Sequence, residues 1–426
     1  MLTGVATNRA GLLMLCSLLA PGYSLAQEVP SEARLLLDSL LRANAHSMQW
    51  SDGAAGGRGF DLLLEAAEEA QFVVVGEQHL TRELPAFTTA LFRQLQARYG
   101  FEYAALEEGP VLSAALGADS LRGDLEAILG YVLRFPNSVH MLSEGEVKMF
   151  AEIGAESNAE HPLWGVNEPV GASHILAELI RRAPSEAARR LAESTLADAL
   201  EYEAERYQKG IKYFDDGPSP SQTDRLAEAF AVDSQSEFLV EMLALAHRIS
   251  APYGANAQTR PGDFFWSSEA REESMKALFV RWYRQAVAGG DTLPKALVKS
   301  GNVHARRGLT PNSELPTFGS FISEVARFNG RSAFFLTAHV VNDESVYQIP
   351  EDSWFRPIAD AASVDDWTLF DLRPVQPWIR SRRLRDLPSE LRDLLRGFDA
   401  LLVMRGATRS SIDGFRTPRF RWFPGG

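Results

Sequence analysis

The stretch FVVVGEQHL, residues 72–80, decides the expected fold. Four apolar residues and a glycine stand directly before Glu77 and His79, and an apolar run that stops at glycine is typical of a buried strand in an open α/β sheet. A helical pattern follows, with Thr81 placed to cap it, and ends at Gly100, where the strand FEYAAL begins at once. This β-α-β spacing predicts that the two strands are parallel neighbours.

Short apolar runs between helical stretches define the rest of the predicted sheet. They lie at 162–169, 295–304, 331–340, 367–372 and 398–404. The fold class is therefore α/β, with a mostly parallel central sheet flanked by helices. Residues 171–290 are strongly helical and too long for one crossover, and a loop is expected within them at 215–222. They predict a helical subdomain inserted between two parts of the α/β domain, 60–170 and 291–426.

The N-terminus has the features of a secretory signal peptide over residues 1–26. Arg9 precedes an apolar run, and small residues stand at Ser24 and Ala26. No later stretch approaches the ~18 apolar residues of a membrane span, so the mature chain is expected to be periplasmic or secreted, without a transmembrane segment. Residues 27–59 are expected to hold a short helix and a flexible linker at 51–59, so that the ordered fold starts near Phe60.

Cysteine count and charge exclude several classes of chemistry. Cys16 is the only cysteine and lies inside the predicted signal, which removes disulfides and cysteine nucleophiles from the mature chain. The net charge of −13, or −14 without the signal, argues against a nucleic-acid partner and leaves a small molecule as the expected one. A basic cluster is interpreted as a solvated helix start; it consists of Arg380, Arg382, Arg383 and Arg385.

Polar residues follow the predicted strand ends, and parallel strands bring such ends to one crevice. Glu77 and His79 follow the first strand, and Glu107 and Glu108 follow the second. The later strands add Asn167, Glu168, Asn302, His304, Arg306, Arg307 and His339. At least two histidines and three carboxylates of this set are therefore expected to meet in one site.

Several of these residues also have a purely structural interpretation. A Glu-x-His pair at a single strand end can equally anchor a loop. Glu108 could face solvent beside Gly109, and Glu168 could cap a helix before Pro169. His339 is expected to be a packed residue. Four other histidines have no comparable setting: His140, His161, His174 and His247.

Several short motifs occur in a fixed order along the chain. They are GEQH at 76–79, LEEG at 106–109, REESMKALF at 271–279, GNVHARRG at 301–308, TFGSFI at 317–322 and FDALLVM at 398–404. In this order they resemble the erythromycin esterase superfamily, which also includes ChaN-like haem-binding lipoproteins and the Tiki and TraB groups. The esterase branch usually has two residues between its first Glu and His, and a second His before the Asn. This chain has one residue there, which is closer to ChaN and Tiki, and it has Gly301 before Asn302.

The resemblance implies a hydrolase of an ester or related acyl bond, with His79 as the general base. Glu77 and Glu107 would orient the imidazole or the water, and His304 would lie near the reacting carbonyl. The residue chemistry agrees, because a neutral imidazole titrates close to neutral pH and a neighbouring carboxylate fixes its tautomer.

Donors to the developing oxyanion are expected from Arg271, Asn302 or protonated His304, and Glu168 is expected to contact the substrate. The chain has no G-x-S-x-G sequence, so a serine esterase of the α/β-hydrolase type is disfavoured. Aromatic stretches at 263–270 and 212–216 could line a pocket for a bulky apolar compound.

Two alternatives stay open from the sequence. The set His79, Glu77, Glu107 and His304 also suits Zn²⁺, Mn²⁺ or Co²⁺, although a His-x-x-His ligand pair is absent and metal-free hydrolysis is favoured. The ChaN-like resemblance instead implies a haem-binding protein, for which Tyr103 and His79 are the candidate ligands.

Overall fold

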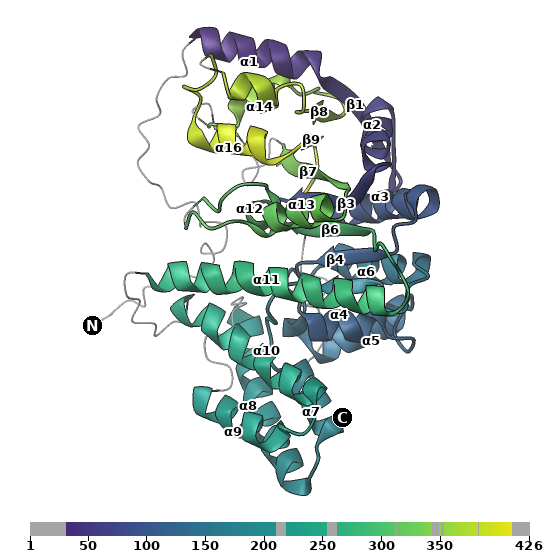
Figure 1. The fold of residues 1–426 in the computed structure, drawn as a ribbon, viewed down its shortest axis with the longest axis vertical. Helices are drawn as coiled ribbons and strands as arrows, with labels where there is room; N and C mark the ends of the chain where they lie inside the picture. Colours follow the sequence, from purple (N-terminus) through teal and green to yellow (C-terminus); the bar gives the residue numbers. More distant parts are fainter. Residues whose placement is uncertain are drawn as a thin grey trace, which may run out of the picture.

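The computed structural model describes residues 31–209, 219–253, 262–311, 313–342, 349–350, 353–381 and 383–410. In this part of the chain, helices cover both faces of one nine-stranded sheet (Figure 1). The strands are β1 (Ala45–Ser51), β2 (Ala54–Gly56), β3 (Ala70–Glu77), β4 (Tyr103–Leu106), β5 (Leu163–Gly165), β6 (Ala296–Gly301), β7 (Ser332–Val341), β8 (Trp367–Asp371) and β9 (Ala400–Arg405). Their order in the sheet is β2-β1-β8-β9-β7-β3-β6-β4-β5.

The six strands from β9 to β5 in this order run parallel to one another. At the other end of the sheet, β8 is antiparallel to β9, β1 is antiparallel to β8, and β2 is antiparallel to β1. The predicted fold class, α/β with a mostly parallel sheet, is confirmed. β3 lies inside the parallel part, and all of its residues are buried. Phe72 and Val74 pack on one face of the sheet and Val73 and Val75 on the other, as the two-residue period of a strand requires.

Two layers of helices bury these faces. The face of Val73 is covered by α2 (Arg58–Ala67), α3 (Leu84–Tyr99), α4 (Pro110–Gly117), α5 (Leu125–Arg134) and α6 (Glu144–Glu156), with η1 (Pro136–Ser138) after α5. The face of Phe72 is covered by α1 (Ser31–Ala43), α12 (Asn302–Ala305), α13 (Phe318–Phe328), α14 (Arg356–Ala361), α15 (Gln376–Ile379), α16 (Ser389–Gly397) and part of α11 (Asp263–Ala288). The sheet is therefore the middle of three layers.

The first two predicted strands, β3 and β4, are parallel but are not neighbours, which corrects the sequence prediction. β6 lies between them: Gly76 in β3 is in register with Ser300, and Leu106 in β4 is in register with Lys299. The crossover through α3 fixes that the strands run the same way, but it does not fix how many strand positions it skips.

The segment predicted as a flexible linker, 51–59, instead contains the end of β1, β2 and the start of α2, and β1 lies before most of it. β1 pairs with β8 from Ala45 opposite Phe370 to Met48 opposite Trp367, and β2 pairs with β1. Met48 is fully buried, so the ordered fold begins well before Phe60. Sequence reasoning misses β1 because AHSMQWS is a mostly polar strand without an apolar run.

The predicted helical insertion contains α7 (Ser173–Arg182), α8 (Glu186–Lys209), α9 (Pro220–Phe230), α10 (Ser234–Ser250), η2 (Ala251–Tyr253) and α11. Helices α7 to α10 pack around their own apolar core and form the lower lobe in Figure 1. The second half of α11 places Met275, Phe279 and Trp282 in the core of the sheet. This long helix therefore joins the two lobes.

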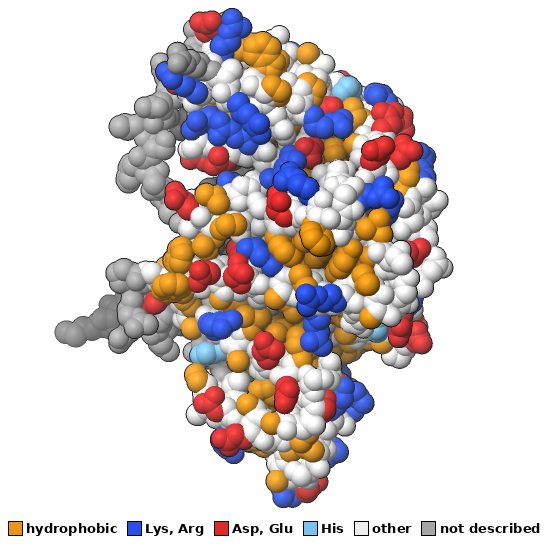
Figure 2. Space-filling view, viewed as in Figure 1, with side chains coloured by type: hydrophobic (Ala, Val, Ile, Leu, Met, Phe, Trp, Pro, Cys, Tyr) orange, Lys and Arg blue, Asp and Glu red, His pale blue; other side chains and the backbone are white. Residues whose placement is uncertain are grey.

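Some sequence predictions fall outside the described residues: the signal at 1–26, the stretch 212–216, and most of the loop at 215–222. Among the described residues, no helix is both long and apolar enough to span a membrane. Figure 2 shows acidic and basic side chains interspersed over both lobes on the face in view.

Candidate active site

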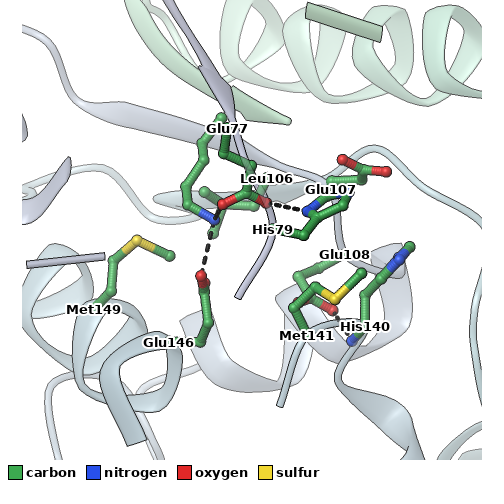
Figure 3. A pocket seen from close by; sticks show the side chains of 10 residues that line it. Glu77, His79, Leu106, Glu107, Glu108, His140, Met141, Glu146 and Met149 are labelled. Atoms are coloured by element: carbon green, nitrogen blue, oxygen red, sulfur yellow. Dashed lines mark hydrogen bonds and ion pairs between the residues drawn. The ribbon is translucent and has the colours of Figure 1, made fainter. Parts of the chain in front are cut away.

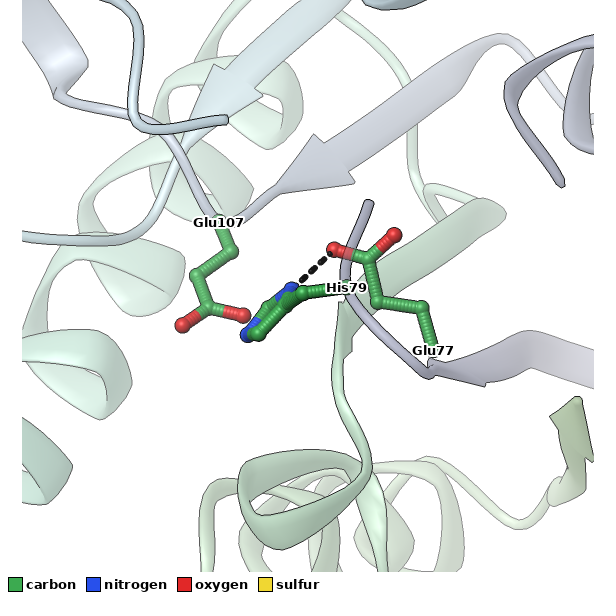
Figure 4. Close-up of side chains that lie close together, drawn as sticks. All are labelled: Glu77, His79 and Glu107. Atoms are coloured by element: carbon green, nitrogen blue, oxygen red, sulfur yellow. Dashed lines mark hydrogen bonds and ion pairs between the residues drawn. The ribbon is translucent and has the colours of Figure 1, made fainter. Parts of the chain in front are cut away.

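The carboxyl ends of β3, β6 and β4 lie side by side and bring the central predicted residues together. Glu77 ends β3 and is in register with Gly301, which ends β6. Glu107 directly follows β4, and its backbone N–H donates to the carbonyl of Lys299 in β6 at 3.1 Å. The imidazole of His79 lies between the carboxylates of Glu77 and Glu107 (Figure 4). Potential ligand atoms of these three side chains all lie within 4.8 Å of one another.

His79 is held through its Nδ1 atom. Nδ1 lies 2.9 Å from Glu77 Oε1, which leaves Nε2 on the side of Glu107 and Gly301. The other oxygen of Glu77, Oε2, lies 2.6 Å from the ammonium of Lys299. Burial alone would raise the pKa of Glu77, but the charge of Lys299 and the hydrogen bond with His79 outweigh it and lower this pKa strongly. Glu77 is therefore a carboxylate that can fix the tautomer of His79.

A second histidine–glutamate pair lies on the other side of Glu107. His304 Nδ1 is 2.6 Å from Glu272 Oε1, and Glu272 Oε2 accepts the backbone N–H of Phe318 at 2.6 Å. His304 Nε2 faces Glu107 Oε1 at 3.9 Å. The Nε2 atoms of both histidines therefore face the same carboxylate.

Glu107 is a carboxylate surrounded by donors and positive groups. Its Oε2 accepts the backbone N–H of Gly301 at 2.5 Å. Burial acts to raise the pKa of Glu107, but His304, His79 and His140 together with this hydrogen bond lower it to about 2. Glu107 stays ionised over the whole range in which histidines titrate.

The two imidazoles share one electrostatic trend. Burial lowers the pKa of His79, but the hydrogen bond and charge of Glu77, with the charge of Glu107, outweigh it and raise that pKa above its ordinary value. The pKa of His304 is raised in the same way, by Glu272 and Glu107 against burial. One site thus holds two unusually basic imidazoles.

A polar cavity beneath Glu77 contains residues that sequence reasoning missed (Figure 3). Lys299 lies there and bridges Glu77 and Glu146, with Nζ 2.9 Å from Glu146 Oε1. A signal was present in the sequence, because a lysine interrupts the apolar strand ALVKSG. Glu146 comes from α6, and burial raises its pKa. Its position could not be inferred without the packing of that helix.

The structure decides between the two alternatives for Glu108 and corrects the expectation for His140. Glu108 is buried rather than solvent-facing, and it accepts the backbone N–H of His140 at 2.8 Å. Burial raises the pKa of Glu108 well above its usual range. The ring of His140 stacks near that of His79 with the centroids 5.9 Å apart, and its Nδ1 lies 2.8 Å from Asn167 Nδ2. The structure thus places a third imidazole in the cavity.

The predicted substrate contact Glu168 and the predicted oxyanion donor Arg271 are paired with each other. Both nitrogens of the guanidinium fork, Nε and Nη2, donate to the Glu168 carboxylate. Glu168 is buried, and the Arg271 side chain is only 15% exposed. This pair brings α11 onto the loop after β5, beside Glu272, and a direct role of either residue stays a prediction.

Asn302 lies at the start of α12 with its amide engaged by β7. Its Oδ1 accepts the hydroxyl of Thr337 at 2.5 Å, and its Nδ2 lies 3.2 Å from His339 Nε2. His339 packs on Phe355 with ring centroids 4.9 Å apart, and burial lowers its pKa to about 4. His339 has the packed setting that the sequence favoured, and Asn302 serves to fix the strand end behind the site.

Gly301 explains why this chain can depart from the esterase pattern. A β-carbon added at Gly301 would lie 2.8 Å from His79 Nε2 and 3.4 Å from Glu107 Oε2. The imidazole of His79 therefore occupies the space that any larger residue before Asn302 would need. The short spacing in GEQH and the glycine before Asn302 belong together as one arrangement.

A divalent metal fits the predicted ligand set only in part. By distance, Glu77, His79 and Glu107 can surround an ion. However, both oxygens of Glu77 already face cationic or donor groups, Lys299 Nζ and His79 Nδ1. A metal bound through Glu77 would lie against a buried ammonium, and Coulomb repulsion there is strong. Glu77 is thus unsuited to bind an ion, and no chemical step here uses one.

The haem alternative has no geometric support at Tyr103. This residue begins β4, at the opposite end of the strand from Glu107, and its ring stacks on Trp164 with the centroids 4.5 Å apart. Haem binding through His79 stays a prediction. The aromatic stretch at 263–270 places Trp266 in a wide groove between α10 and α11, which shares none of its lining residues with the cavity at Lys299.

The chain has an erythromycin esterase-like fold. A histidine-to-asparagine variant of the erythromycin esterase EreC in its open conformation aligns with a TM-score of 0.57 and 15% identity, over 86% of this chain and 99% of that one. A succinoglycan biosynthesis protein aligns with a TM-score of 0.55 and 13% identity, over 90% of this chain and 100% of that one. A protein from Bacillus cereus aligns with a TM-score of 0.54 and 13% identity, over 89% and 99%.

No protein-family model and no curated protein sequence matches the chain significantly. The resemblance that the ordered motifs predict is confirmed at the level of the fold by the three solved structures.

Proposed function

We propose that this chain is a hydrolase that activates water against an ester or related acyl bond of a small molecule, with His79 as the general base. The observation that carries the proposal is the Glu77–His79 pair at 2.9 Å, with Nε2 beside the ionised Glu107 at the end of a parallel sheet. The fold that it shares with an erythromycin esterase supports the reaction class.

In the proposed reaction, neutral His79 takes a proton from water at Nε2 while the water oxygen attacks the carbonyl carbon. Glu77 stabilises the resulting imidazolium through Nδ1, and the buried Lys299 keeps Glu77 ionised. The imidazolium then gives its proton to the leaving oxygen as the carbon–oxygen bond breaks. General base catalysis of this kind contributes about 10²- to 10⁴-fold.

His304 is the proposed donor to the oxyanion. Glu272 holds Nδ1, both nearby carboxylates raise the pKa of His304 and so favour the imidazolium, and Nε2 points toward Glu107. A charged donor at the developing oxyanion is worth about 10²- to 10³-fold in rate. Arg271 and Asn302, which are engaged with Glu168 and Thr337, are assigned to support the walls of the site.

The test is turnover of simple and macrocyclic esters by the wild type and by His79→Asn. The variant is expected to lose about 10²- to 10⁴-fold in kcat, because the asparagine amide cannot take the proton from water as an imidazole does. His161→Asn is the matched control, since that imidazole is 38% exposed and pairs only with Glu160 among the charged residues described. Equal rates for His79→Asn and the wild type would contradict the proposal.

Metal-free chemistry is part of the proposal, and chelation tests it. Prolonged dialysis against a chelator is expected to leave kcat within about twofold, because Lys299 already supplies the positive charge next to Glu77. Loss of activity that Zn²⁺, Mn²⁺ or Co²⁺ restores would contradict this part. We also propose that the chain acts after export, which the features of residues 1–26 support and cell fractionation would test.

A further inference from the structure

The loop that carries His79 contains an unusual backbone conformation. Leu80, the next residue, has φ of 64°, which is the left-handed region that non-glycine residues rarely adopt. Such a conformation persists only when surrounding contacts hold it, and it often marks a functional site. The question is which contacts hold Leu80, because they also decide where the His79 ring lies.

The contacts come from the other end of the chain. Residues 407–410, which follow β9 and are called the C-terminal strap, pair with residues 80–83. Ser410 donates its backbone N–H to the carbonyl of Leu80 at 2.7 Å, and Arg82 donates its N–H to the carbonyl of Thr408 at 2.9 Å. Thr81 and Arg409 form an isolated antiparallel bridge between these two hydrogen bonds. The left-handed turn is therefore closed from outside the loop.

The side chain of Glu83 stabilises the same pairing through two hydrogen bonds, which are called the Glu83 clasp. The carboxylate of Glu83 accepts the backbone N–H of Thr408 at 2.9 Å and the Thr408 hydroxyl at 2.8 Å. Glu83 is the residue immediately before α3, so the clasp joins the start of that helix to the strap. The strap itself is tied to the residue that follows β7, because Asn342 Nδ2 donates to the carbonyl of Ala407 at 2.8 Å.

We propose that the C-terminal strap is a positioning element for His79, with Thr408 and Ser410 as its positioning residues. This inference rests on the proposed role of His79 as the base. The strap does not touch the reacting atoms. It holds the left-handed turn at Leu80 and so fixes the orientation of the neighbouring His79 side chain.

Loss of the strap contacts is expected to loosen the loop without unfolding it. Two bonds that do not involve the strap remain: Gln78 Oε1 accepts the backbone N–H of Val340 at 2.9 Å, and Thr81 Oγ1 donates to the carbonyl of Gln78 at 2.8 Å. The effect should therefore appear in kcat and in local hydrogen exchange more than in KM or the melting temperature.

The test uses the full-length variant Thr408→Val/Ser410→Pro, which removes the hydroxyl donor to Glu83 and the N–H donor to Leu80. Hydrogen exchange of peptides covering residues 78–84 is expected to accelerate, and kcat is expected to fall between about 10- and 100-fold, as a misplaced catalytic group implies. Thr195→Val is the matched control, because this buried hydroxyl donates only within α8, to Leu191. It should change neither measurement.

A rescue variant separates positioning from a merely structural role. Adding Leu80→Gly to the double variant removes the penalty of the left-handed turn, and at least part of the lost kcat is expected to return. Unchanged exchange at 78–84 in the double variant would overturn the proposal, as would a loss of kcat that Leu80→Gly leaves untouched. If the wild type turns over no ester, the proposed function fails, while the exchange measurement still decides whether the strap holds the loop.

Discussion

The two histidine–glutamate pairs of the site differ in what holds their carboxylates. Glu77 is held by the buried ammonium of Lys299, whereas Glu272 is held by a neutral backbone N–H, that of Phe318. The side chain of His79 is 35% exposed, and that of His304 is 15% exposed. The Glu77–His79 pair, with its cationic support and more exposed ring, is suited to take up and release a proton. The Glu272–His304 pair, without such a cation on its carboxylate, is suited to stay protonated.

This difference indicates that a charged residue outside each histidine–glutamate pair decides whether the histidine accepts or donates a proton. Lys299 opposes protonation of His79 by its own positive charge, while it keeps Glu77 ionised and able to orient the ring. Arg271 acts on His304 in the same direction but ranks behind the two carboxylates that favour the imidazolium. The predictions below change one support at a time.

The largest effect is expected from removal of Lys299. Lys299→Met leaves Glu77 and Glu146 buried together without a cation, and loss of one partner of a buried ion pair costs about 3–5 kcal/mol in the free energy of unfolding. Chemical denaturation would measure it. The double variant Lys299→Met/Glu146→Met should recover only part of that loss, since it removes the second buried carboxylate but still leaves Glu77 without the ammonium.

Lys148→Met is the matched control for that measurement. Lys148 Nζ lies 3.6 Å from Glu152 on the surface of α6, where its side chain is 62% exposed. An exposed pair contributes about 0–1 kcal/mol. A Lys299 variant as mild as this control would mean that the ammonium does not support Glu77.

Gly301→Ala is expected to affect the first pair more than the second. The added carbon would lie 2.8 Å from His79 Nε2 and would push the imidazole away from Glu107. Misplacing a catalytic group by about 1 Å costs about 100-fold in rate, so a loss of this order is expected in kcat. Gly130→Ala is the matched control, because nothing lies near its added carbon and its φ is not left-handed. Gly290→Ala is unsuitable, because Gly290 has φ of 106°. Equal kcat in both alanine variants would show that His79 does not need the space above Gly301.

The two pairs also differ in how far the sequence could predict them. Glu77, His79 and Glu107 follow visible apolar runs, and strand ends meet by a general rule, so their convergence could be inferred. Glu272 could not, because it lies on a helix far from the sheet in sequence. The motif REESMKALF drew attention to Arg271 instead, one residue before it, and only the rotation of α11 decides which side chain reaches His304.

Strand order and the edge of the sheet were beyond the sequence for a related reason. The pairing of β3 with β6 depends on where the chain returns after the helical lobe, and no local pattern records that return. β1 was missed for a different reason: this strand next to the edge of the sheet buries only Met48 and so carries little apolar signal. Lys299 is visible in the sequence as a charged residue inside a predicted strand. Its partner Glu146 comes from α6, so the ion pair could not be inferred without the packing of that helix.

The smallest expected effect concerns the pH dependence of the second pair. His79 acts when neutral, so activity should fall as the pH drops below its raised pKa. His304 acts when protonated, so activity should fall again as the pH rises above its own raised pKa. The profile of kcat/KM is therefore expected to be bell-shaped, with both limbs belonging to the coupled site. Glu272→Gln removes the main group that raises the pKa of His304, so the alkaline limb should move to lower pH.

At neutral pH the loss from Glu272→Gln is expected to be on the order of tenfold, since the imidazole stays in place but is protonated less often. Glu273→Gln is the control, because this neighbour on α11 is 67% exposed and pairs with Lys276. Its profile should match that of the wild type. An alkaline limb that stays in place in Glu272→Gln would remove His304 as the proton-bearing donor and leave Glu77–His79 as the working pair.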